Sequence, residues 1–72
     1  MNPREWRESE KLSQGEVAAK ITQKTGRLYR QSHVSGWENG AMADALVGDA
    51  YREISRGKVR GVDFGKPINK GN

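Results

Sequence analysis

The sequence predicts an all-α protein, a small bundle of four to five short helices followed by a flexible basic C-terminal tail. Three observations lead to this fold class. The chain has 72 residues and no cysteine, so we expect a single domain whose stability comes from apolar packing or from association with a partner. Capping signals mark two helix starts, and apolar residues recur at helical spacing further along. We expect the helical domain to span residues 1–56 and the tail to span residues 57–72.

The first helix is predicted from the residues that begin it. Asn2 is a good N-cap, and Pro3 suits the first helical position because its missing N–H would be unpaired there. Glu5 stands three residues after the cap, as a capping box requires. We therefore expect a helix over residues 3–11, with Trp6 as its main inward side chain.

The second helix has the clearest start in the sequence. Ser13 and Glu16 repeat the capping box, and apolar residues at helical spacing follow them. We expect this helix to run over residues 14–24. Gly26 should end it, because glycine readily takes up the left-handed conformation that closes many helices.

Two further helices are predicted from the spacing of apolar residues. Val34 and Trp37 are three residues apart and face the core in a short helix over residues 31–39. An amphipathic series predicts a fourth helix over residues 41–56, which Gly48 weakens in its middle. The predicted core combines apolar residues from all four helices, namely Trp6, Leu12, Val17, Ile21, Val34, Trp37, Leu46, Ala50 and Ile54.

The tail is predicted from its composition. Residues 57–72 contain four glycines, one proline and few apolar groups, a composition that favours a mobile chain. Polar and apolar residues alternate weakly over residues 59–64, which leaves open a short strand that pairs across a dimer.

Positive charge is concentrated in two stretches of the chain. Residues 20–36 carry four basic side chains and no acidic one, and residues 56–72 carry five basic side chains against the single acidic residue Asp63. This distribution predicts a basic face that attracts a polyanion. The basic side chains expected to contact phosphates are Lys20, Lys24, Arg27 and Arg30.

Several classes of protein are disfavoured by the residues present. No apolar run approaches the roughly 20 residues that span a bilayer, and the first residues are unlike a signal peptide, so we expect a cytoplasmic protein. His33 is the only histidine and cysteine is absent, which supports neither a metal site nor a histidine-based dyad. No catalytic triad, paired acids or phosphate loop is visible. We therefore expect no enzyme, no cofactor and no small-molecule substrate.

The helix over residues 31–39 is predicted to present a small polar face. With Val34 and Trp37 directed inward, Ser32, Ser35 and Gly36 turn outward at about 100° per residue, and Gln31 and His33 flank that face. A face this small can enter a major groove about 12 Å wide, where glutamine pairs with adenine through two hydrogen bonds and serine bonds to either kind of base pair. These residues are the expected base contacts.

Three short motifs follow one another along the chain. They are Trp6-Arg7, Leu12-Ser13-Gln14-x-Glu16-Val17-Ala18 and Val34-Ser35-Gly36-Trp37-Glu38-Asn39-Gly40. In this order they resemble the helix-turn-helix family of the lambda-repressor and Cro type, also called the XRE type. The resemblance covers about residues 4–56 and implies a DNA-binding domain.

The resemblance also implies roles for individual residues. The first residues of the third helix contact base edges in this family, and here they belong to the polar face just described. Gln14 matches a position that contacts a phosphate, and Asn39 with Gly40 matches a loop that does the same. Arg7 and Glu38 match a pair that forms a salt bridge between the first helix and the end of the third.

The spacing of the motifs departs from the family pattern. Between Val17 and Trp37 the chain is longer than is usual for the family, so the helix-turn-helix is a variant with a lengthened turn. Either the second helix is longer by more than a turn, or a basic loop precedes the third helix. We favour the longer helix, ended by Gly26, with residues 27–30 as an arm beside the DNA. The family's fifth helix has no counterpart after Gly57, which favours dimerisation as a further source of stability.

Together these features predict sequence-specific binding of double-stranded DNA by a transcriptional regulator of the phage-repressor type. We expect it to bind an operator or promoter as a homodimer, at the nucleoid of a prokaryotic or phage-infected cell. The alternative is a protein-interaction module, such as an antitoxin or antirepressor, that holds a partner through the helix over residues 43–54 or through the tail. That alternative predicts a copurifying protein and no duplex retained at low salt.

Overall fold

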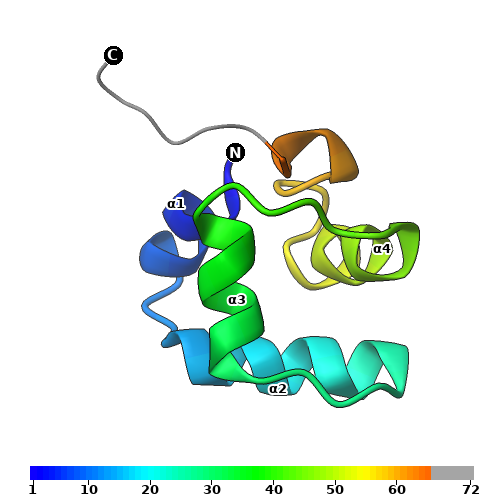
Figure 1. Ribbon diagram of the computed structural model, residues 1–72. Helices are drawn as coiled ribbons and strands as arrows, with labels where there is room; N and C mark the ends of the chain where they lie inside the picture. The colour runs from blue at the N-terminus through cyan, green and yellow to red at the C-terminus, as the bar shows by residue number, and fades with distance from the viewer. Residues whose placement is uncertain (66–72) are drawn as a thin grey trace.

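A computed structural model describes residues 1–65 of the chain, and in these residues the only regular structure is helical. The elements are α1 (Pro3–Ser9), α2 (Gln14–Thr25), α3 (Gln31–Glu38), α4 (Ala45–Ile54) and the 3-10 helix η1 (Gly61–Asp63). In Figure 1, α2 runs along the bottom of the molecule, α3 stands steeply on it, and α1 and α4 lie to either side of α3. The predicted all-α fold is confirmed. Within residues 1–65, no helix combines the length and the apolar composition needed to cross a lipid bilayer.

The starts of α1 and α2 are set by local capping, as the sequence predicted. The side chain of Asn2 accepts a hydrogen bond from the backbone N–H of Glu5 at 2.8 Å. Ser13 and Glu16 cap each other reciprocally, at 3.0 Å and 2.8 Å. The first helix is shorter than expected and ends at Ser9, before Lys11 turns the chain with a φ of 56°. Two short helices are therefore fixed at their N-termini by residues within one turn.

The connection between α2 and α3 accounts for the additional residues in the predicted turn. As predicted, α2 ends at Gly26, which has a left-handed φ of 77°. The chain then runs back alongside α2 to the start of α3 (Figure 1). Thr22 holds this return segment, because its Oγ1 accepts from the backbone N–H of Tyr29 at 2.8 Å and donates to the Tyr29 carbonyl oxygen at 3.3 Å. Thr25 Oγ1 accepts from the N–H of Arg27 at 3.1 Å.

Helix α4 begins later than predicted, and one of its predicted core residues is exposed. It starts at Ala45 rather than at residue 41, because Asp44 caps it by accepting from the N–H of Val47 at 2.9 Å. Val47, Ala50 and Tyr51 are buried, whereas Leu46 is 37% exposed. The prediction that Leu46 lies in the core is therefore wrong. The buried side of α4 packs against the rest of the chain, so only the other side of the helix over residues 43–54 is open to a partner.

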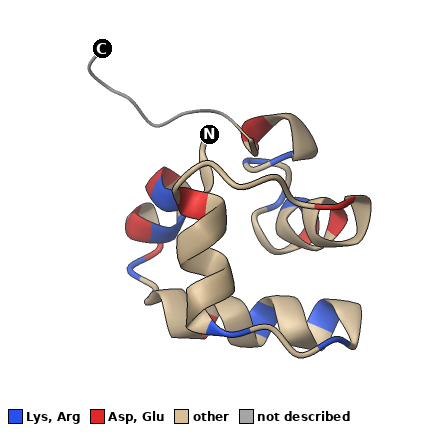
Figure 2. Ribbon diagram, in the orientation of Figure 1, with Lys and Arg blue, Asp and Glu red and all other residues tan. Residues whose placement is uncertain are grey.

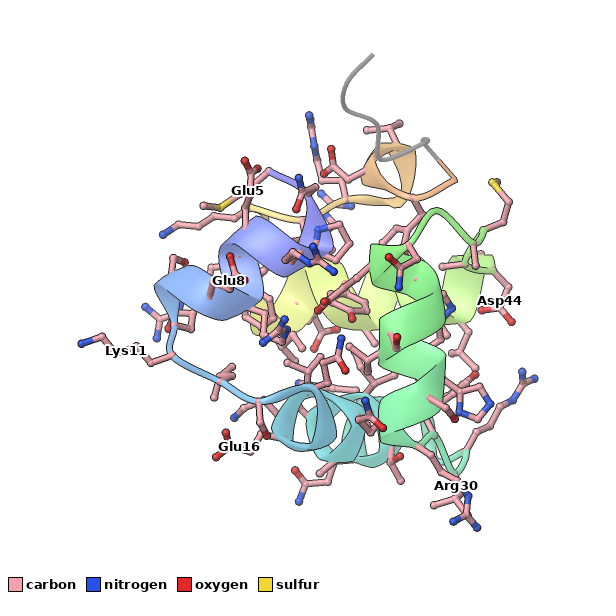
Figure 3. All side chains as sticks on the ribbon, turned by 60° about the vertical axis from the view of Figure 1, so that its left-hand side comes forward. Glu5, Glu8, Lys11, Glu16, Arg30 and Asp44 are labelled. Carbon is pink, nitrogen blue, oxygen red and sulfur yellow. The ribbon has the colours of Figure 1, made fainter. Side chains whose placement is uncertain are left out.

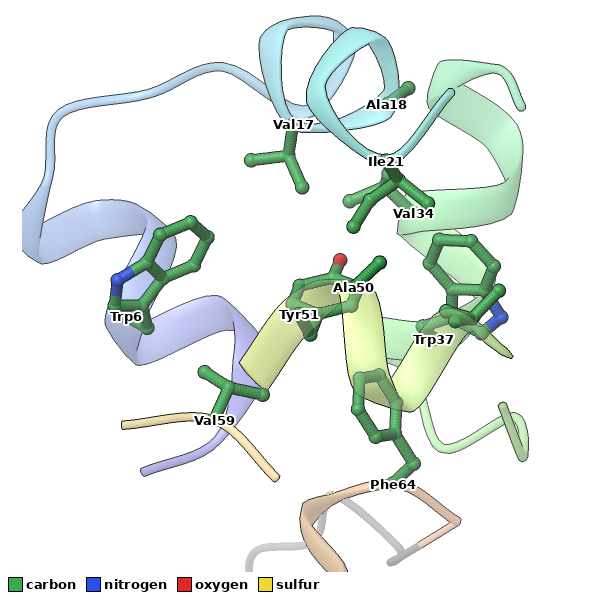
Figure 4. Packing of buried hydrophobic residues seen from close by; sticks show 11 residues of the cluster. Trp6, Val17, Ala18, Ile21, Val34, Trp37, Ala50, Tyr51, Val59 and Phe64 are labelled. Atoms are coloured by element: carbon green, nitrogen blue, oxygen red, sulfur yellow. The ribbon is translucent and has the colours of Figure 1, made fainter. Parts of the chain in front are cut away.

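Tyr51 lies at the centre of the core, between the rings of Trp6 and Trp37 and next to Phe64 (Figure 4). It makes edge-on contacts with these three rings at centroid distances of 6.2, 5.8 and 5.0 Å. Edge-on aromatic pairs of this kind add to the stabilisation that area burial provides. The buried apolar residues are Trp6, Val17, Ala18, Ile21, Val34, Trp37, Val47, Ala50, Tyr51, Val59 and Phe64.

Residues 57–65 belong to the folded domain, which corrects the predicted boundary at residue 56. Val59 is fully buried and Phe64 is 5% exposed. The hydroxyl of Ser55 accepts from the N–H of Val59 at 2.9 Å and so directs this segment back over the core. Two apolar side chains thus outweigh the glycine-rich composition that predicted a mobile tail. The remainder of that predicted tail, residues 66–72, lies outside the described residues.

Candidate nucleic-acid interface

One edge of α3 is polar and open to solvent. Gln31, Ser32 and His33 are exposed, while Ser35 and Gly36 are half-buried. A methyl group at Gly36 would lie 3.9 Å from the Cβ of Ala41, so the loop that follows α3 partly covers this end of the edge. The predicted base contacts therefore share one side of the helix and are most accessible at its N-terminal end. The opposite side of α3 is buried.

His33 is held in place by the start of its own helix. Its Nδ1 accepts a hydrogen bond from the backbone N–H of Arg30 at 2.9 Å. Its ring also meets the rings of Tyr29 and Trp37, at centroid distances of 5.4 and 6.2 Å. This hydrogen bond occupies Nδ1 within the protein. His33 therefore caps α3, and only its Nε2 side remains to meet a base.

A chain of hydrogen bonds connects the starts of α2 and α3 to the end of α3. Gln31 Nε2 donates to Gln14 Oε1 at 2.6 Å, and Gln14 Nε2 donates to Glu38 Oε1 at 3.0 Å. Arg7 of α1 donates to both Glu38 oxygens, from Nε at 2.5 Å and from Nη2 at 3.0 Å. The predicted salt bridge between Arg7 and Glu38 is thus formed. Four residues from three helices make one network, and Gln31 is its exposed end.

Glu38 is the buried centre of this network. Its side chain is fully buried, and the Nε of Arg4 lies 3.5 Å from its Oε1. Burial by itself would raise the pKa of Glu38, but hydrogen bonds from Arg7 and Gln14 and the charges of Arg7 and Arg4 outweigh it and lower that pKa. The hydrogen bond to Glu38 in turn raises the pKa of Arg7. Glu38 is therefore an ionised carboxylate at neutral pH.

Two of the four predicted phosphate-binding cations, Lys24 and Arg27, are paired with acidic residues. Lys24 pairs with Glu53 at 2.7 Å and Arg27 pairs with Asp44 at 3.7 Å, so acids of α4 and its cap meet both of them. Lys20 lies one turn before Lys24 on α2 and shares its flank, which is opposite to the flank that carries Thr22. The structure therefore brings neither lysine to the exposed edge of α3.

Arg30 is the basic residue nearest to the polar edge in sequence. It is the N-cap residue of α3, it is exposed, and within residues 1–65 no carboxylate lies within 4 Å of its guanidinium. Figure 3 shows its side chain reaching away from the body of the molecule. Figure 2 shows basic residues along α2 and before α3, while α3 itself carries only an acidic residue at its end. Arg30 is thus the cation best placed beside the base-contacting candidates.

The loop after α3 places the remaining phosphate candidates at the other end of the edge. Asn39 is exposed, and its Nδ2 donates to the carbonyl oxygen of Ser35 at 2.8 Å. Gly40 has a left-handed φ of 103°, which turns the chain away from the helix. Both ends of the polar edge are therefore flanked by candidates for phosphate contact.

Several residues that shape this site were not anticipated from the sequence. Arg4 reaches Glu38 beside Arg7, and its position three residues earlier on the same face of α1 is the signal that could have indicated it. Thr22 and Thr25 hold the return segment through their hydroxyls. Threonines in the last turn before Gly26 are a weak signal, because their partners depend on the path of the chain after the helix.

Within residues 1–65, no three acidic or histidine side chains gather as metal ligands would. Comparisons of the chain with models of protein families, with curated proteins and with solved structures found no match.

Proposed function

We propose that this protein binds double-stranded DNA in a sequence-specific manner and regulates transcription as a repressor of the helix-turn-helix type. The observation that carries the proposal is the polar, exposed edge of α3 next to the N-terminus of α2. Gln31 and Ser32 are exposed at the start of α3, and no acidic residue lies on that edge before Glu38, which is buried. A helix with small polar side chains on its outer face fits a major groove.

The contacts around this edge support two separate roles. Gln31 would recognise a base, and the residues at the two ends of the edge would hold the protein on the DNA backbone. Gln31 is tethered to Gln14, so its amide is oriented before any base is met. Arg30 at one end and Asn39 at the other are exposed and suit contacts with phosphates on the two sides of a groove. The order of the three motifs, with their resemblance to repressor domains, supports the same use of α3.

The wider biological role is part of this proposal. A transcriptional repressor with a small reading surface gains specificity by binding a two-fold-symmetric operator as a homodimer. We place such a dimer in the cytoplasm, on the nucleoid of a prokaryotic or phage-infected cell.

Selection of duplexes from a random pool, repeated at two salt concentrations, tests the proposal. Recovery of a common sequence by the wild-type protein is the expected result. Gln31→Ala should then lose about 1–3 kcal/mol at one base position and little elsewhere. Arg30→Ala should weaken all duplexes alike and lower the slope of log affinity against log salt by about 0.9.

Two matched variants serve as controls. Gln23 is an exposed glutamine of α2, nine residues after Gln14 and on the opposite side of the helix, and Arg52 is an exposed arginine of α4. Gln23→Ala and Arg52→Ala should leave the selected sequence and the salt slope unchanged. Equal effects of Gln31→Ala and Gln23→Ala would contradict base reading by α3. A copurifying protein together with no duplex retained at low salt would favour the interaction-module alternative instead.

A further inference from the structure

We propose that the buried carboxylate of Glu38 is a positioning group for base recognition, because it sets the orientation of the Gln14 amide and, through it, the orientation of the Gln31 amide. Glu38 thereby determines which hydrogen-bonding groups Gln31 presents to a base. The inference rests on the proposed DNA-binding function. It concerns a residue that cannot touch DNA itself, since its side chain is fully buried.

The carboxylate of Glu38 dictates the direction of every hydrogen bond that reaches it. An ionised carboxylate only accepts hydrogen bonds, and every polar group that faces it must therefore donate. Arg7 donates to Glu38 from two nitrogens, and the side chain of Gln14 lies 3.0 Å from Glu38 Oε1. The Gln14 atom at this distance must be the amide nitrogen, because an oxygen there would face another acceptor.

Gln14 extends this orientation to Gln31 at the surface. With Nε2 of Gln14 turned toward Glu38, its Oε1 points toward Gln31, at 2.6 Å. An amide oxygen only accepts, so Gln31 must in turn place its own amide nitrogen there. Reversing either amide would bring two oxygens or two N–H groups together. The negative charge on Glu38 thus sets which atom donates and which accepts in both hydrogen bonds, from Gln14 to Glu38 and from Gln31 to Gln14.

The consequence is a fixed arrangement at the exposed end. One N–H of Gln31 is used by Gln14, which leaves its second N–H and its Oε1 for a base. A donor beside an acceptor matches adenine, which offers N7 as an acceptor and its N6 amino group as a donor. Guanine offers two acceptors in the major groove and cannot satisfy Oε1. The network therefore favours adenine over guanine at the base pair that Gln31 meets.

The internal part of the inference is tested by nuclear magnetic resonance on the free protein, without DNA. The side-chain amide protons of Gln14 and Gln31 should exchange with water at least several-fold more slowly than those of the exposed Gln23. Glu38→Gln, which can donate as well as accept, should remove this protection at both glutamines. Exchange at Gln14 as fast as at Gln23 in the wild-type protein would overturn the inference, whatever the protein binds.

The recognition part is tested by the ratio of affinities for duplexes that carry adenine or guanine at the position affected by Gln31→Ala. A good bidentate contact discriminates by roughly tenfold or more, and this ratio should fall to about twofold or less in Glu38→Gln. Gln14→Ala should produce the same loss while keeping the ion pair between Arg7 and Glu38. This second variant decides the matter if Glu38→Gln fails to fold.

Glu53→Gln is the matched control, because it makes the same chemical change at an exposed glutamate that pairs with Lys24. Its adenine preference should equal that of the wild-type protein. A folded Glu38→Gln and a folded Gln14→Ala that both keep the wild-type ratio would refute the positioning role. Failure of the wild-type protein to bind any duplex would instead refute the proposed function, and the exchange experiment would still report on the network.

Discussion

Replacing Val59 with alanine should remove a large part of the stability of this protein, whereas the same replacement at Val62 should have little effect. The two valines lie three residues apart in the segment that follows α4. Val59 is 0% exposed and Val62 is 64% exposed. The pair therefore tests burial, because the same two methyl groups are removed at both positions.

The size of the effect follows from the groups that are removed. Val59→Ala deletes two buried methyl groups, worth about 0.8 kcal/mol each in transfer free energy, and leaves a cavity that adds about 1 kcal/mol. The expected loss is about 2–3 kcal/mol. A chain of 72 residues has a total stability of only about 4–11 kcal/mol. Val62→Ala should change the free energy of unfolding by about 0.5 kcal/mol or less.

Urea and thermal denaturation followed by circular dichroism measure both variants against the wild-type protein. A loss of about 2 kcal/mol corresponds to a fall in Tm on the order of 10 °C for a domain of this size. Phe64→Ala, which removes the ring packed on Tyr51, should lose about 3–5 kcal/mol and approach complete unfolding. The reasoning is refuted if Val59→Ala is as stable as Val62→Ala, since residues 57–65 would then not belong to the core.

Three further predictions concern pH, the core hydroxyl and the glycines of α2. The pKa of Glu38 is lowered in the folded state, so its contribution to stability is complete above its ordinary value of 4.5 and is lost as the pH falls below that value. Urea midpoints measured between pH 7 and pH 3 check this, and a midpoint that stays constant below pH 4.5 would contradict it. The buried hydroxyl of Tyr51 has no hydrogen-bond partner in residues 1–65. Tyr51→Phe should therefore leave the free energy of unfolding unchanged or raise it by up to about 1 kcal/mol. A loss above about 1 kcal/mol in denaturant titrations would mean that the hydroxyl does form a hydrogen bond in the folded protein. Gly26→Ala should lose about 1 kcal/mol because φ is 77° there. Gly15→Ala, inside α2, should gain up to about 1 kcal/mol, because the added methyl group would lie 3.9 Å from Ser13 Oγ, an ordinary contact distance. Equal thermal midpoints for these two variants would show that backbone conformation does not distinguish the two positions.

The helix starts were predictable because each depends on residues that are close together in the chain. The caps at Asn2 and Ser13 bond to backbone groups three residues later, and Gly26 ends α2 through its own φ angle. The exposed edge of α3 was predictable for a similar reason. Once Val34 and Trp37 are inside, helical geometry alone turns Ser32 outward.

The network behind that edge could be predicted only in part. The pairing of Arg7 with Glu38 was inferred from a resemblance, and the structure forms it. The contact of Gln14 with Glu38 spans 24 residues and depends on how α2 and α3 cross. Lys24 was expected to face a phosphate, yet it meets Glu53 of α4, because the flank of α2 on which it lies is decided by packing against another helix.

By itself, the sequence determined the helical fold class, the positions where α1 and α2 begin and the polar character of the outer side of α3. Each of these depends on propensities and spacings within a few residues. Only the tertiary structure decided that Leu46 of α4 stays outside the core, that residues 57–65 complete the core, and in which direction the amides of Gln14 and Gln31 point. These features arise from contacts between distant parts of the chain, where the burial of apolar side chains and the pairing of the buried Glu38 carboxylate outweigh local preference.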